Sequence, residues 1–435
     1  MNFAKISGAA LCRKFFYSIS FMETAIPTPA SWSTATKILF RFFFVYLLCY
    51  VPASWWVEFS SFSPWNAIVL FTGHHVFNID ITVMPNGSGD TTWNFVQLVV
   101  IGSISLLATV VWTWIDRKRA NYDTLLFWFL IFLRYFLAYM MLVYGLAKVF
   151  KTQFPFLSLE RLATPLGQFS PMGLLWAFMG YSKTYNLFTG GAEILAGSLL
   201  FFRRTTLLGA LISIAIMINI LMLNFSYDVP VKLFSAHLLV VAVVIVAPQL
   251  KRLISFFILN QAIAPENIRP AIAHPKARVF YGIGKAIIIL VIVEQLVVSG
   301  LKREAEVAAF FPERFDTYEI VEHKTNGVVV PEEDKTRRWQ KLYVLTKDKC
   351  SLQYMDGAAI RWNFAADTVA HTMSLISLDS GTAYHFQYAI ANDSLYRLKG
   401  KLDEDSIHIA MRKNSDEFLL INRGFHWINE YPFNR

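Results

Sequence analysis

The sequence predicts a membrane-embedded bundle of about seven α-helices followed by an antiparallel β domain. Of its 435 residues, 55% are apolar and only 16% are charged, and the mean hydropathy is +0.42. Soluble domains carry about 25% charged residues, and here the deficit falls before residue 300. Beyond residue 300, short alternating stretches separated by turn residues are typical of antiparallel strands. We therefore expect a multi-pass membrane protein with a β-rich tail, folded as a small barrel or sandwich.

Residues 125–150 form the most informative predicted span. At about 1.5 Å per residue, this stretch is long enough to cross a bilayer, and its two charged residues are Arg134 and Lys148. A charge at bilayer depth costs roughly 2.5–3.5 kcal/mol, so it normally faces a protein interior and has a partner. Ala138 and Gly145 lie between the two charges and permit the close approach of another helix. This helix is therefore predicted to line a buried polar site.

Lys and Arg clusters set the predicted topology, because loops rich in these residues face the cytoplasm. Such clusters occur at 116–119, 203–204 and 251–252, whereas residues 42–116 contain neither Lys nor Arg. This pattern predicts a bacterial inner-membrane protein with a cytoplasmic N-terminus and an extracytoplasmic C-terminal domain. The expected spans are about 36–57, 94–115, 125–150, 187–202, 206–224, 231–248 and 279–300. The expected domains are a cytoplasmic lead-in (1–35), two helices with an outer loop (36–124), a four-helix unit (125–250), a basic inner loop with the seventh helix (251–300) and the extracytoplasmic β-rich domain (301–435).

Polar groups on several of these helices fall at a similar depth. Measured from the outer helix ends, most of them lie about 8–9 Å down, and Lys148 about 3 Å down. The predicted layer contains Tyr144, Lys148, Glu193, Asn219, His237 and Glu294. Arg134 lies too deep to reach this layer, at about 24 Å from that helix end. We therefore expect Lys148 to pair with Glu193.

Each member of this layer has a structural and a functional interpretation. Glu193 lies among Gly190, Gly191, Ala192, Ala196 and Gly197, which predicts a buried carboxylate. Buried carboxylates and histidines can relay protons, so Glu193 and His237 are the candidate catalytic residues. Lys148, Tyr144, Arg134, Asn219 and Glu294 are the candidate ligand-binding residues. The structural alternatives are that Lys148 extends to the headgroups, that His237 and Asn219 cross-link helices, and that Glu294 faces the tail domain.

Several other classes of site are disfavoured. The net charge of +9 comes mostly from Lys and Arg at helix ends, so nucleic acid is not expected as a partner. The three cysteines are far apart, which argues against a dithiol enzyme and a cysteine zinc site. His74 and His75 are adjacent and would point to different sides of a regular element, so no metal site is predicted. Trp339, Trp362 and Trp427 are interpreted as core residues of the tail.

The middle of the chain resembles a known membrane family. The segment LRYFLAYMMLVYGLAKVF, followed by GGAEILAGSLLFFRRTTLLGALI, is similar to the DoxX family. The matching positions, all within about 125–250, are Arg134, Gly145, Lys148, Glu193, Gly197 and Arg203. The resemblance implies a four-helix membrane unit linked to redox work, as in subunits of thiosulfate:quinone oxidoreductase. The wider layout also resembles, more distantly, the vitamin K-dependent carboxylase-like membrane proteins.

Three functions remain open from the sequence. The first is an envelope scaffold whose helices bind membrane lipid and whose tail binds an extracytoplasmic protein. The second is a subunit of a quinone-linked membrane oxidoreductase, which would need a bound quinone or a redox partner subunit because no residue of the chain carries electrons easily. The third is a small-molecule transporter, against which the lack of an inverted repeat counts. A redox site requires a hollow polar layer, whereas a scaffold requires a packed one.

Overall fold

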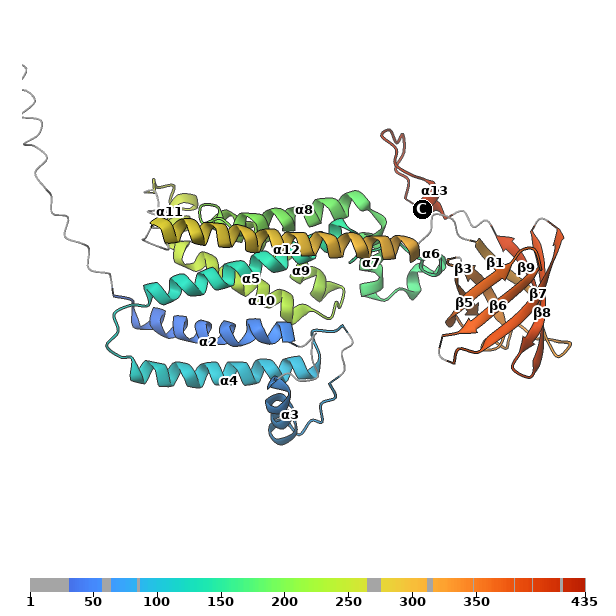
Figure 1. Cartoon of the computed structure of the whole chain (residues 1–435), viewed down its shortest axis with the longest axis horizontal. Coiled ribbons are helices and arrows are strands. Elements are labelled where there is room, and N and C mark those ends of the chain that lie inside the picture. Colours follow the sequence, from blue (N-terminus) through green and yellow to red (C-terminus); the bar gives the residue numbers. More distant parts are fainter. Residues whose placement is uncertain are drawn as a thin grey trace, which may run out of the picture. The chain divides into compact units, whose positions relative to one another are not determined.

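The computed structural model describes residues 31–56, 64–83, 87–263, 275–310, 316–346, 348–378, 380–392, 394–414 and 418–434. Two compact units are distinguished, Met1–Phe136 and Leu137–Arg435. The first contains α2 (Thr34–Trp56), α3 (Pro64–Phe77), α4 (Thr92–Ile115) and the first half of α5 (Asp123–Val149) (Figure 1). The second continues with α6 (Leu159–Ala163), η1 (Leu166–Gln168), α7 (Pro171–Tyr181), α8 (Lys183–Leu200), α9 (Thr206–Ser226), α10 (Lys232–Val246), η2 (Ala247–Gln249), α11 (Leu250–Phe257), α12 (Pro275–Phe310), the strands and α13 (Leu419–Asn422).

Six helical segments among the described residues are long and apolar enough to cross a membrane. They are Thr34–Ala53, Thr92–Ile115, Asp123–Val149, Thr206–Ser226, Lys232–Phe257 and Gly282–Glu306. Large apolar side chains are exposed along them, for example Leu106, Leu107 and Val110 on α4. Such side chains suit lipid and not water as their surroundings. The prediction of a multi-pass membrane protein is confirmed.

The helix expected as the fourth span, 187–202, differs from the other six. It forms α8, which has 18 residues and includes both Lys183 and Glu193. These residues make α8 less apolar than its neighbours, and it is not among the six candidate spans. The remaining expected spans agree with the observed helices to within a few residues, except that α12 continues to Phe310.

The segment predicted as an outer loop is partly helical. The expected outer loop contains a helix, α3, whose last turn carries His74 and His75. His74 Nδ1 lies 2.9 Å from Asp80 Oδ1, and both side chains are exposed. The predicted lead-in, 1–35, lies almost wholly outside the described residues.

Capping side chains define where several helices begin. Thr91 and Asn94 form a capping box at the start of α4, in which each side chain satisfies the backbone of the other residue. Ser182 accepts a hydrogen bond from the backbone N–H of Tyr185 at the start of α8, at 3.1 Å. Ser170 accepts one from Gly173 at the start of α7, at 3.0 Å. These caps fix the residues at which α4, α7 and α8 begin.

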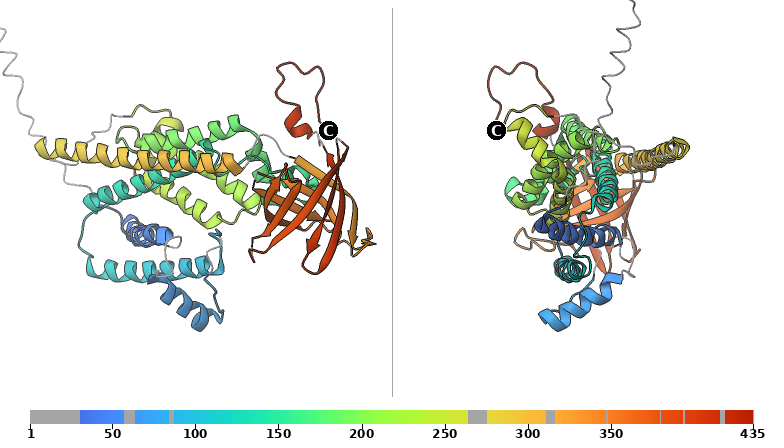
Figure 2. Two further views of the ribbon diagram at one scale, coloured as in Figure 1. Left: turned by 45° about the vertical axis from the view of Figure 1, so that its right-hand side comes forward. Right: turned by 90° about the vertical axis from the view of Figure 1, so that its left-hand side faces the viewer.

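The tail forms an eight-stranded antiparallel β-barrel. Each strand pairs with the next along the chain, and β1 closes the barrel by pairing with β9, from Thr317↔Asn414 to Thr325↔Ile407. The left view of Figure 2 shows these strands wrapping into a barrel. The barrel strands are β1 (Asp316–Thr325), β3 (Trp339–Val344), β4 (Lys349–Tyr354), β5 (Ala359–Asp367), β6 (Thr372–Ser377), β7 (Ala383–Asn392), β8 (Leu395–Leu402) and β9 (Asp405–Asn414); β2 (Val328–Val329) pairs with β1 alone.

Side-chain alternation fills the inside of this barrel. On β9, Ile407, Ile409 and Met411 are buried, while the residues between them face outward. An eight-stranded barrel is just wide enough for side chains to fill it. The buried core comprises Ile320, Trp339, Leu342, Cys350, Leu352, Met373, Leu375, Phe386, Leu398, Ile407, Ile409 and Met411. The alternation of apolar and polar residues in the sequence predicted the strands. The pairing of β1 with β9 closes the sheet, so the tail is a barrel and not a sandwich.

The three tail tryptophans have different environments. Trp339 is buried in the barrel core, and Trp362 packs against that core. Trp427 is 91% exposed, so its interpretation as a core residue was wrong. The physical reason is its position, because β9 ends at Asn414 and Trp427 follows outside the alternating pattern.

His323 on β1 is a polar residue inside the barrel wall. It is 2% exposed, and its Nδ1 accepts a hydrogen bond from the Trp339 backbone N–H at 3.2 Å. Burial, with the nearby charge of Arg338 adding to it, lowers the pKa of His323 from 6.5 to about 4. The ring is therefore neutral in the folded barrel near neutral pH.

We expect the barrel to lose stability as the pH falls from 6.5 toward about 4. In this pH window His323 is protonated in the unfolded chain but stays neutral in the folded barrel. The free energy of unfolding should therefore fall by about 2–3 kcal/mol across the whole window. Hydrogen exchange of the β1 and β3 amides in detergent, corrected for intrinsic rates, measures this change. His323→Gln should remove most of it, whereas His385→Gln at an exposed position should not. An unchanged opening free energy in the unsubstituted chain would contradict the account.

Candidate functional site

The candidate site is built on the last turn of α5, which carries Lys148. This side chain is 8% exposed, although lysine rarely becomes buried without a partner. Its neighbours on the same face of α5 are small or apolar, and Ala138 and Met141 are buried. The lysine therefore enters a helix contact and does not extend to the headgroups.

Glycines allow the backbones of α5 and α8 to approach closely at this point. A Cβ atom on Gly190 would lie 2.6 Å from the Gly145 carbonyl oxygen, and one on Gly145 would lie 2.8 Å from the Gly190 carbonyl oxygen. One on Gly197 would lie 2.9 Å from the Ala138 carbonyl oxygen. No side chain larger than hydrogen fits between these backbones, as in other close contacts between membrane helices.

This contact brings Lys148 and Glu193 together as a buried ion pair. Lys148 Nζ donates to both Glu193 carboxylate oxygens at 2.9 Å, and the Glu193 side chain is 1% exposed. Each charge thus receives its opposite in a place without water, which is what intramembrane charges require. The predicted pairing of Lys148 with Glu193 is confirmed.

Aromatic rings cover the ammonium group of Lys148. Its Nζ lies 5.9 Å from the centroid of Tyr144 and 6.0 Å from that of Phe154, within the range of cation–π attraction. The Tyr144 ring in turn lies 6.3 Å from Phe234 on α10. Tyr144 is therefore beside the pair, as predicted.

His237 lies on α10, where it is largely buried. Its Nδ1 is 2.6 Å from the carbonyl oxygen of Leu233, four residues earlier in the same helix. A carbonyl oxygen only accepts, so Nδ1 carries the proton and the ring is oriented by its own helix. Its position three residues after Phe234 places it on the side of α10 that reaches Tyr144.

Arg134 lies near the middle of α5. It precedes Lys148 by 14 residues, or about 21 Å of helix. It is buried, and its guanidinium lies 5.3 Å from the centroid of the Tyr135 ring. The expectation that Arg134 is too deep to reach Glu193 agrees with this spacing.

Asn219 and Glu294 are not brought to the pair. Both are exposed, on α9 and α12 respectively. The buried face of α9 includes Ser213 and Met217, and two further residues turn the helix by about 200°, which carries Asn219 to the opposite face. Glu294 precedes Gly300, the residue of α12 that approaches Phe150, by six residues, which places it about 120° from that contact. Depth along a helix does not determine which way a residue points.

Polar residues that were not predicted as site residues connect several helices. Asn224 Nδ2 donates to Ser235 Oγ at 2.9 Å and joins α9 to α10. Lys285 on α12 donates to the carbonyl oxygen of Phe201, which caps the end of α8. Asn224 directly precedes the turn FSYDVP, and this position next to a tight turn is the signal that could have identified it.

A second overlooked cluster surrounds Arg41 in the first unit. Its guanidinium donates to Tyr122 Oη at 2.7 Å and to Thr113 Oγ1 at 2.8 Å. Tyr122 Oη donates in turn to Asp116 Oδ2 at 2.9 Å. Arg41 is 2% exposed. Its hydrogen bond to Thr113 links α2 with the end of α4. Opposite charges at two adjacent helix ends, Arg41 and Asp116, were the available signal.

Comparisons with known proteins extend this description over part of the chain. The chain is 38% identical over 124 residues to the uncharacterized protein YwoB of Bacillus subtilis (strain 168). The match covers 28% of this chain and 79% of YwoB. Over that segment, the chain belongs to the family of YwoB.

The relation to YwoB carries no activity to this chain, because YwoB is itself described as uncharacterized. No family model matches the chain. No solved structure matches it either. None of these comparisons supports the resemblance to the DoxX family, which stays a prediction.

We expect single substitutions of the ion pair to destabilise the helices strongly. Lys148→Met or Glu193→Leu leaves one buried charge without its partner, which costs about 3–5 kcal/mol. The double variant Lys148→Met/Glu193→Leu removes both charges and should recover most of this loss. Unfolding in mixed micelles of detergent and dodecyl sulfate measures the free energies.

Lys183→Met is the matched control, because Lys183 is exposed on the first turn of the same helix. It should change the unfolding free energy by less than about 0.5 kcal/mol. If the double variant were as unstable as the worse single variant, the two charges would not be acting on each other.

Proposed function

We propose that the chain is a membrane-anchored scaffold whose helices hold the β-barrel outside the cytoplasm, where the barrel binds a partner protein. The observation that carries this proposal is the closed packing of the polar site. Glu193 is 1% exposed, and the α5 and α8 backbones meet directly on either side of it. A quinone or another lipid-soluble ring would need access to these groups, whereas the close α5–α8 contact leaves the Glu193 carboxylate almost no exposed surface and two aromatic rings lie beside Lys148.

The orientation in this proposal rests on the distribution of positive charge. The clusters at 116–119, 203–204 and 251–252 follow α4, α8 and α10, and all three are assigned to the cytoplasmic side. This assignment counts α8 as a seventh crossing, in which the charge of Glu193 is paired with Lys148. With seven crossings the chain after α12 lies on the opposite side from the three clusters. The barrel is then extracytoplasmic.

The outer surface of β8 offers a binding face for the partner. Arg397, Lys399 and Lys401 are exposed and alternate with Leu398, which is buried. Lys399 stands opposite His408 on β9 in the sheet register. This row of cations favours an acidic partner surface, and complementary charge mainly supplies specificity and association rate.

A subunit of a quinone-linked, DoxX-like redox system is the second candidate. The observation that favours it is the buried ionisable pair beside Tyr144, with His237 on the neighbouring helix α10. In that case Glu193 and His237 would exchange protons with a bound quinone. A transporter stays an untested alternative.

Two variants separate the candidates in the native host. The double variant Lys148→Met/Glu193→Leu removes the ionisable pair. The triple variant Arg397→Glu/Lys399→Glu/Lys401→Glu reverses the charge of the outer surface of β8. The scaffold account expects the double variant to restore the competitive growth of a deletion strain, and the triple variant to fail. Immunoblots of membranes must show equal protein levels.

The opposite outcome contradicts the scaffold. If the double variant fails at normal membrane levels while the triple variant restores growth, the charges of the pair have a chemical role. The redox candidate would then be favoured.

A further inference from the structure

The segment after the barrel exposes an unusual amount of aromatic surface. Trp427 is 91% exposed, Tyr431 84%, Phe425 79% and Ile428 77%. These residues fall within seven positions of one another, near α13. A contiguous apolar patch of this kind on a protein surface marks a site that contacts another phase or molecule.

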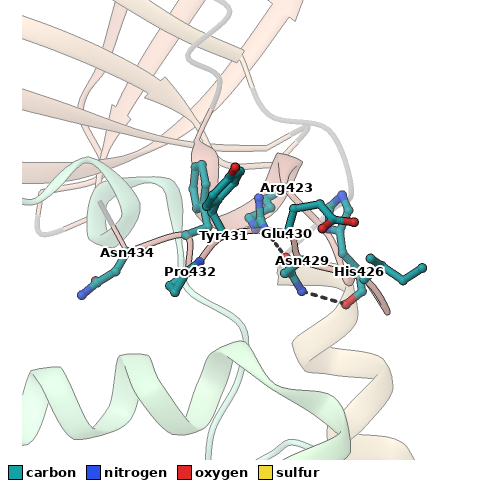
Figure 3. Close-up of a pocket in the computed structure, with 9 residues that line it drawn as sticks. Arg423, His426, Asn429, Glu430, Tyr431, Pro432 and Asn434 are labelled. Atoms are coloured by element: carbon teal, nitrogen blue, oxygen red, sulfur yellow. Dashed lines mark hydrogen bonds between the residues drawn. The ribbon is translucent and has the colours of Figure 1, made fainter.

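Contacts within the segment hold it in a folded-back loop. Arg423 donates to Asn429 Oδ1 at 2.5 Å, and its guanidinium lies 4.1 Å from the centroid of Phe433. Asn429 Nδ2 donates to the carbonyl oxygen of His426 at 3.2 Å. Figure 3 shows these side chains around an open cavity of about 460 Å³. These contacts therefore give a defined conformation to the loop that carries the exposed aromatic side chains.

The sheet register fixes the end of the barrel from which this loop emerges. Asn414, the last residue of β9, stands opposite Thr317, at the start of β1, and Lys413 Nζ lies 2.6 Å from Asp316 Oδ1. The chain therefore leaves the barrel at the same end at which it enters from α12. We call this the entry end.

The entry end is tethered near the bilayer. The last candidate span finishes at Glu306 within α12, and only five residues separate Phe310 from Asp316. Five residues reach roughly 20 Å when fully extended. The loop that leaves the entry end is consequently within reach of the headgroup layer in every molecule.

We propose that residues 418–434 form an interfacial membrane anchor that holds the entry end of the barrel against the lipid headgroups. Trp and Tyr are enriched at membrane–water interfaces, because their rings are apolar and each carries one polar group. Arg423 adds positive charge suited to phosphate groups. The bilayer is favoured over a protein partner because the tether already brings it within reach.

Spin labels on the full-length protein test this anchor. In a Cys12→Ser/Cys49→Ser background, which keeps the buried Cys350, one label is placed at Ile428→Cys in the loop. The matched control is Glu404→Cys, in the turn between β8 and β9 at the other end of the barrel. The protein is reconstituted in nanodiscs of equal parts phosphatidylcholine and phosphatidylglycerol. Power saturation measures collisions with oxygen and with a water-soluble nickel chelate.

We expect the ratio of oxygen to nickel accessibility to be severalfold higher at position 428 than at position 404. Adding Trp427→Ser/Tyr431→Ser should bring the ratio at 428 down to the value at 404. These exposed residues lie outside the barrel core, so the variant should fold. Equal, water-like ratios at both positions would overturn the proposal. So would low accessibility of position 428 to both reagents, because a protein surface would then cover the loop.

Discussion

The ion pair between Lys148 and Glu193 constrains the helices more than any other described interaction. Either charge alone is too costly in a membrane interior, so α5 and α8 must present both side chains to the same point. Bidentate contact at 2.9 Å allows little freedom in the rotation of either helix. The glycines at 145 and 190 then allow the backbones to meet. The ion pair depends on the close approach of the two helix backbones, because a wider spacing of α5 and α8 would separate the charges.

Other links extend this arrangement. A Cβ on Gly209 would lie 3.0 Å from the Ala196 carbonyl oxygen, so α9 approaches α8 almost as closely as α5 does. The hydrogen bond from Asn224 to Ser235 then joins α9 to α10. Each connection uses either a small residue or a polar pair, because lipid offers no hydrophobic drive for helices to associate. The polar residues of this region therefore have sufficient structural reasons to be there.

Much of the fold was predictable from local pattern. Hydropathy located the helices, and alternation located the strands, because both reflect which side chains can be buried. The ion pair was predictable too, since a buried Glu needs a partner and the long side chain of Lys148 can reach the depth of Glu193. Asn219 and Glu294 were not predictable in the same way, because depth leaves the rotation of a helix undetermined. Closure of the barrel depends on pairing between β1 and β9, which no local pattern records. Trp427 was wrongly predicted as a core residue, because the sequence alone does not distinguish an exposed tryptophan from a buried one.

The central claim is that the polar site is closed and structural. The most direct measurement is to purify the full-length protein gently from native membranes and extract it with organic solvent. Absorbance and mass spectrometry of the extract then identify any bound quinone and its ratio to protein. The account predicts no quinone above the level in an extract of an unrelated membrane protein prepared in the same way. A near-stoichiometric quinone that is lost in the Glu193→Gln variant would contradict it.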